Sequence, residues 1–117
     1  LIVQKLASNP DAYGFFGYSY LVANKDKIKA AAINGVKPSL EGIQDYSYPI
    51  ARPLFFYVKK AHIGVVPGIE EFIKAFTSKK AMGPRGYLAE IGLVPLAKDK
   101  YKAIRTAALE LQTISIK

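Results

Sequence analysis

The pattern of apolar and polar positions predicts a strongly amphipathic helix in the second half of the chain, at residues 67–77. Its apolar positions, three or four residues apart, are Ile69, Phe72, Ile73 and Phe76. Charged residues occupy the opposite face, and Pro67 suits a first helical turn, where a missing N–H costs nothing. We therefore expect this helix to pack its apolar stripe against another element.

Shorter periodic segments predict further helices. They are 1–8, 18–24, 40–46, a short helix after a turn within 83–92, and a last helix from Asp99 to about Leu111. Ser39 is expected to cap the helix at 40–46 and Asp99 the final one, because a side-chain oxygen there can accept a free backbone N–H. An extended link is predicted at 93–96 and a short tail at 113–117.

Three apolar segments have the composition of strands: 13–21, 28–33 and 52–60. The last holds five apolar residues without a polar break, which is typical of a strand covered on both faces in an α/β protein. Asn34-Gly35 predicts a type I′ hairpin turn, since both central residues need a positive φ. Three strands alone would leave open edges, so we expect their partner strands to lie outside these 117 residues.

Composition narrows the possible classes of protein. The 117 residues, half of them apolar, suffice for one modest globular domain, and no apolar run approaches the roughly 18 residues of a membrane span. No targeting segment and no initiator Met are present, so we expect a piece of a longer chain. The net charge of +8 falls almost entirely in residues 51–117. Such an excess could face an anion, a nucleic acid or an acidic partner, or simply be solvated.

Candidate chemistry is sparse. The chain has no cysteine, and His62 is its only histidine, without a nearby pair of carboxylates, so we predict neither a metal site nor an enzyme. The Gly-Pro-Arg-Gly stretch at 83–86 could cradle an anion or be a surface turn; it lacks the phosphate-loop pattern. Beside it, Lys79, Lys80 and Arg85 could meet an acidic partner or form a solvated face.

Three blocks of sequence, in this order, resemble the C-terminal part of periplasmic phosphate-binding proteins, the substrate-binding components of phosphate ABC transporters. They are NPDAYGFFGYSYLVANKDKIKAAAINGVKPS at 9–39, YPIARPLFFYVKK at 48–60 and PGIEEFIKAF at 67–76. The resemblance extends through essentially the whole chain. The G-F-F-G-Y and Y-P-I-A-R-P-L stretches together are its most specific parts.

The resemblance implies an α/β fold: the C-terminal portion of a two-lobed type II periplasmic binding protein, lacking its N-terminal part. Residues 1–50 would then be part of the second lobe. Residues 51–117 would supply a crossover strand and the C-terminal part of the first lobe. Pro49 and Pro53 would stiffen that crossover, because proline fixes φ; a loop-to-strand junction inside one domain is the alternative.

The implied function is phosphate transport. Such a protein captures inorganic phosphate without catalysis or cofactor, in a cleft between its lobes, and presents it to a membrane permease from the periplasm or another extracytoplasmic space. The family's phosphate-binding loops have no match in this sequence, so most ligand residues are expected upstream. Arg52, Tyr18 and Ser19 are the local candidates. The alternatives are pairing of Arg52 with a carboxylate of the other lobe and core packing of Tyr18.

Two other readings of the residues remain. A small basic domain could bind nucleic acid by stacking bases on some of its fourteen Tyr and Phe side chains. Those aromatics lie inside apolar runs, not between Lys and Arg, so we favour phosphate capture and expect no nucleic acid. A truncated chain whose strands lack partners could also self-associate, by swapping elements between copies.

Overall fold

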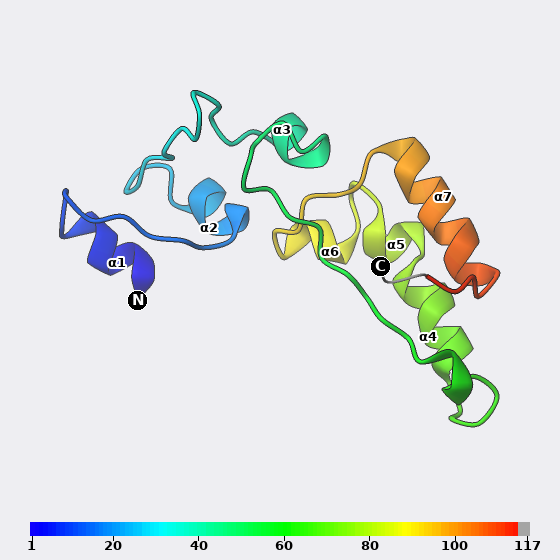
Figure 1. Ribbon diagram of the computed structural model, residues 1–117. Coiled ribbons are helices and arrows are strands. Elements are labelled where there is room, and N and C mark those ends of the chain that lie inside the picture. The colour runs from blue at the N-terminus through cyan, green and yellow to red at the C-terminus, as the bar shows by residue number, and fades with distance from the viewer. Residues whose placement is uncertain (115–117) are drawn as a thin grey trace. The chain divides into compact units, whose positions relative to one another are not determined.

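The computed structural model describes residues 1–114, and the Cα packing divides the chain into two compact units. The first comprises Leu1–Arg52 and Ile91–Val94, and the second comprises Pro53–Glu90 and the chain from Pro95 on. Figure 1 shows the helices of both units. Of the tail predicted at 113–117, residues 115–117 lie outside the described residues. No helix within residues 1–114 is long and apolar enough to cross a bilayer.

The first unit contains three short helices, α1 (Ile2–Ala7), α2 (Tyr18–Ala23) and α3 (Leu40–Gln44), which confirms the helices predicted there. Helix α3 begins as predicted, because Ser39 Oγ accepts a hydrogen bond from the Gly42 N–H at 3.0 Å. Helices α1 and α2 have no side-chain cap. Helices of five or six residues are marginal on their own, so their stability depends on packing.

The predicted hairpin turn in the first unit is confirmed. Asn34 and Gly35 have φ values of 50° and 78°, as a type I′ turn requires. On either side, the Ile33 N–H donates to the Val36 carbonyl at 2.9 Å, and the Val36 N–H donates back at 3.0 Å. This single bridge is all that forms of the strand expected at 28–33.

As far as residue 114, the second unit contains one 3₁₀ turn and four α-helices. They are η1 (Lys60–His62), α4 (Ile69–Phe76), α5 (Lys79–Met82), α6 (Tyr87–Glu90) and α7 (Lys98–Leu109). Helices α4, α6 and α7 confirm predicted helices, whereas η1 and α5 were not predicted.

Two predicted helix starts were wrong. Pro67 precedes α4 instead of lying in its first turn, because Gly68, with a φ of 85°, is the residue at the N-cap. Asp99 does not cap α7; it lies inside the first turn, and the N-cap residue is Ala97, which has no capping side chain. Asp99 still suits its place, since a carboxylate in a first turn interacts favourably with the helix dipole.

The three predicted strands, 13–21, 28–33 and 52–60, form no ladder within residues 1–114. The residues after Pro53 run without a helical turn toward η1 (Figure 1), and Lys59 is extended, with φ −76° and ψ 108°. Among residues 1–114, no backbone hydrogen bond engages the N–H groups of residues 54–58. A strand is stable only beside another strand, and the described chain places none there.

Few side chains of the described residues are buried. The buried apolar ones are Ile28, Ala51, Ile73 and Ala81. By contrast, Leu54, Phe55 and Tyr57 are 79%, 68% and 64% exposed. Single exposed apolar residues are ordinary, but a contiguous run of this kind indicates surface that another segment normally covers.

Helices α4 and α7 of the second unit are joined through the carbonyl of Thr77, the residue that ends α4. This oxygen accepts hydrogen bonds from Tyr101 Oη at 3.0 Å and from Arg105 Nη1 at 2.6 Å. Thr77 is only 4% exposed, and its own Oγ1 donates to the Ile73 carbonyl at 2.7 Å. A cation at the C-terminal end of α4 also complements the helix dipole.

Removing the charged donor should therefore loosen this helix pair. Arg105→Ala is expected to lower the free energy of unfolding by about 1.5–3 kcal/mol, and Tyr101→Phe by about 1 kcal/mol, as a part-buried carbonyl loses a charged or a neutral donor. The exposed Lys102 on α7 is the control, with an expected loss below about 0.5 kcal/mol for Lys102→Ala. Urea unfolding followed by circular dichroism measures all three, and equal losses would contradict the role of Thr77.

Candidate functional site

Arg52, the first candidate, is the last residue of the first unit's long segment. Its Nη1 donates to the carbonyls of Ala51 at 2.7 Å and Pro49 at 3.2 Å. Both acceptors belong to its own loop, and pairing with a carboxylate of the other lobe stays a prediction. Because a guanidinium has five N–H donors and this side chain is exposed, donors remain for an anion.

Tyr18 and Ser19, the other two candidates, are the first residues of α2 and are both half-buried. Ser19 packs against Gly92, a residue distant in sequence but part of the same unit. Gly92 has a φ of 98°, and a Cβ atom there would overlap the Ser19 side chain. This close approach fixes where Ser19 lies, and sequence reasoning did not foresee it.

The structure does not join the three candidates into one constellation. Among the described residues, no hydrogen bond links Arg52 to Tyr18 or Ser19. The Arg52 guanidinium is fixed by its own loop, whereas Ser19 is fixed by Gly92. What these residues contribute to a ligand site stays a prediction.

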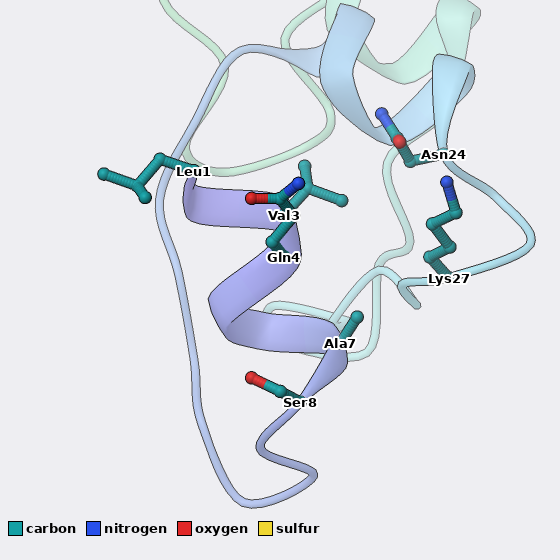
Figure 2. Close-up of a pocket in the computed structure, with 7 residues that line it drawn as sticks. All are labelled: Leu1, Val3, Gln4, Ala7, Ser8, Asn24 and Lys27. Carbon is teal, nitrogen blue, oxygen red and sulfur yellow. The ribbon is translucent and has the colours of Figure 1, made fainter.

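An open pocket that the sequence did not indicate lies in the first unit, beside α1 (Figure 2). Its volume is about 490 Å³, and it is lined by Leu1, Val3, Gln4, Ala7, Ser8, Asn24 and Lys27. Asn24 is oriented by a hydrogen bond from its Nδ2 to the Tyr20 carbonyl at 2.9 Å. With Lys27 as the only cationic side chain in its lining, this pocket does not offer the several convergent side-chain donors that a phosphate dianion needs.

In the loop before Arg52, a neighbouring residue lowers the pKa of the Asp45 carboxyl. The Ser47 N–H donates to Asp45 Oδ1 at 2.8 Å, and with the Ser47 hydroxyl this hydrogen bond lowers the pKa of the Asp45 carboxyl. Asp45 therefore stays ionised at neutral pH. No group of three or more His, Cys, Asp or Glu side chains in residues 1–114 could hold a metal ion.

The extended segment 53–59 of the second unit is covered on one face only. Phe56 lies against two aromatic rings of α4, with centroid distances of 5.5 Å to Phe72 and 4.7 Å to Phe76. Phe55 and Tyr57, which alternate with Phe56, contact each other at 5.8 Å and remain mostly exposed. The backbone groups of residues 54–58 form no hydrogen bond with the backbone of residues 1–114, so they are open beside α4 in the described part of the chain.

Comparison with known families places the chain. A family model described as the PBP superfamily domain matches residues 2–80, so the chain belongs to that superfamily. The resemblance noted from the blocks at 9–39, 48–60 and 67–76 is confirmed by this match and by curated relatives.

Those relatives are phosphate-binding proteins. The Phosphate-binding protein PstS of Staphylococcus aureus strain USA300 is 36% identical over 107 residues, which cover 87% of this chain and 32% of that protein. The protein of the same name from strain MRSA252 is 38% identical over 95 residues, covering 75% of this chain and 29% of that protein. No solved structure matches.

The chain therefore spans about a third of the length of these relatives. Their names describe phosphate binding. The absence of a ladder at residues 52–60 is also compatible with a chain that carries only part of such a fold.

Proposed function

We propose that this chain is part of a phosphate-capturing solute-binding protein of an ABC importer. In this proposal the complete protein has the two-lobed α/β type II fold, works outside the cytoplasm, binds inorganic phosphate without catalysis and delivers it to a membrane permease. The observation that carries the proposal is the 36% identity, over 87% of this chain, with a protein named for phosphate binding.

The division of the chain supports the proposed assignment of residues 1–50 to the second lobe and 51–117 to the crossover strand and first lobe. The two compact units separate between Arg52 and Pro53, within two residues of the proposed boundary. Residues 91–94 pack with the first unit, so the chain returns to it once before α7. Such a return suits two lobes joined by several extended connections.

The open segment 53–59 supports the proposed position of a crossover strand. Its aromatic face is exposed and its backbone is unpaired within residues 1–114. On the surface of a complete protein this would favour aggregation, because unpaired strand edges pair readily with other strands. In the proposal, strands from the remaining two thirds of the protein flank it on both edges. Pro53 suits the first position of such a strand, where no N–H is required.

A chimeric protein tests the proposed function. In it, this chain replaces the matching third of the Staphylococcus aureus relative. Isothermal titration calorimetry is expected to show phosphate binding with little binding of sulfate. The 117-residue chain alone is expected to bind phosphate weakly or not at all, because the family's ligand loops have no match in it. A cooperatively folded chimera that does not bind phosphate would overturn the proposal.

The same chimera tests the candidate residue Arg52. If its free N–H donors reach the anion, Arg52→Ala weakens phosphate binding by about tenfold or more, as the loss of a charged hydrogen bond does. Lys29→Ala, which removes an exposed cation of the same unit, is the control and should change the affinity little. If the two variants changed the phosphate affinity equally, Arg52 would not contact the ligand. The proposed function would still stand.

A further inference from the structure

The turn between α5 and α6 in the second unit is held by several short-range hydrogen bonds. The Gly86 N–H donates to the Gly83 carbonyl at 2.8 Å, which closes the turn, and the Gly83 N–H donates to the Lys79 carbonyl at 3.0 Å. At the start of α5, Ser78 Oγ accepts from the Ala81 N–H at 3.3 Å. Consecutive hydrogen bonds of this kind hold a short segment in one conformation.

Both glycines of this turn are buried and lie against backbone. A Cβ atom at Gly83 would overlap the Lys79 carbonyl, and one at Gly86 would overlap the Ala81 carbonyl. Ala81 is itself fully buried. The turn is therefore packed as closely as its backbone permits, which keeps the residues at its surface in fixed places.

What this packed turn exposes is cationic. Lys79, Lys80 and Arg85 are all exposed, and no hydrogen bond or ion pair engages their side chains within residues 1–114. No acidic residue occurs between Glu71 and Glu90. Beside the cations, Tyr87 at the start of α6 is 45% exposed. We name Lys79, Lys80, Arg85 and Tyr87 the basic turn.

Helix stability does not account for these charges. Lys79 and Lys80 directly follow the capping residue Ser78, and because α5 is a single turn of four residues they belong to its last turn as well, so the helix dipole neither favours nor disfavours them. Three like charges without an acidic neighbour also repel one another. Local stability therefore gives no reason for this arrangement of charges.

We propose that the basic turn is a docking surface for an acidic patch on another protein. A rigid turn loses little conformational entropy on binding. Arginine and tyrosine are the residue types that most often dominate protein interfaces, and lysines around them steer an acidic partner. A lipid surface is disfavoured because the three cations of the basic turn are fewer than the roughly four to eight that make up a lipid-binding cluster. Docking is independent of phosphate capture, so its failure leaves the proposed function untouched.

Charge reversal with a matched control tests this inference. The probe is a fluorescent peptide of ten glutamates, titrated against the full 117-residue chain at low salt. The variant Lys79→Glu, Lys80→Glu, Arg85→Glu is expected to bind it about tenfold or more weakly, because three modest contacts are lost together. The control reverses Lys60, Lys98 and Lys102, three exposed cations of the same unit, and should change the affinity less than about threefold.

Two further measurements separate the alternatives. Tyr87→Ala is expected to weaken peptide binding without changing its dependence on salt, since it removes contact area and no charge. Vesicles containing anionic phosphatidylglycerol and single-stranded DNA should lose less affinity than the peptide in the charge-reversed variant. If the two triple variants lost equal affinity for the peptide, net charge alone would explain the effect. If the charge-reversed variant lost as much affinity for vesicles or DNA as for the peptide, the basic turn would be a general anion-binding surface. Either result overturns the proposal.

Discussion

In the isolated chain, the backbone N–H groups of residues 54–58 are expected to exchange with solvent within about tenfold of the rate of an unstructured peptide. The reason is that none of them donates to a backbone carbonyl of residues 1–114, although α4 holds the segment through Phe56. Adding the remaining two thirds of the Staphylococcus aureus relative as a separate polypeptide should slow this exchange about a thousandfold, equivalent to about 4 kcal/mol of local stability. Hydrogen exchange followed by NMR measures both states.

The N–H groups of α4 are the internal control. The Phe72 N–H already donates to the Gly68 carbonyl at 2.9 Å, so its protection should change far less on addition of the second polypeptide. Protection of residues 54–58 in the dilute chain alone would contradict the proposed crossover strand. Protection that rises with the concentration of the chain alone, together with a larger mass by light scattering, would show copies pairing with one another, as element swapping requires.

The features predicted correctly from the sequence are those closed by neighbouring residues. The turn at Asn34-Gly35 needs only two positive φ angles, and the cap of α3 needs only the Ser39 hydroxyl three residues from its donor. The period of α4 extends over two turns, so its existence was also evident. These elements are determined by local hydrogen bonds and local backbone preferences, and both can be predicted from neighbouring residue types.

Helix starts were predicted less well because several residues compete for them. Asp99 has the side chain of a cap, yet α7 begins one residue earlier, after Ala97. Pro67 has the right φ for a first turn, yet Gly68 takes the left-handed conformation between it and α4. The choice depends on how the preceding chain approaches the helix, and residue type does not determine that path.

The candidate site depends on residues far apart in sequence, which explains why sequence reasoning found its members and not their surroundings. Ser19 was identified as a candidate, but its close approach to Gly92, which is distant along the chain, was not foreseen. The strands show the same limit. Their apolar composition indicates burial in a sheet, but a ladder also needs a second strand, which the described part of the chain does not place beside them.

Because Ser19 lies so close to Gly92, a side chain at position 92 is expected to have a large effect on stability. Gly92→Ala is expected to lower the free energy of unfolding by about 2–5 kcal/mol, because alanine at a φ of 98° is strained and its Cβ overlaps Ser19. Gly35→Ala is the matched control. Gly35 also has a positive φ, of 78°, but nothing lies within 4 Å of its Cβ position, so only about 1–2 kcal/mol of backbone strain is expected.

The double variant Ser19→Gly, Gly92→Ala separates the two causes. Removing the Ser19 side chain removes the overlap and leaves the strain, so the pair should recover about 1–3 kcal/mol relative to the sum of the single variants. Urea unfolding followed by circular dichroism measures each free energy. Strictly additive losses would mean that Ser19 does not contact Gly92. A positive coupling would place residues 91–94 against α2 in solution, and would make this contact the constraint that orients Ser19, whatever ligand it meets.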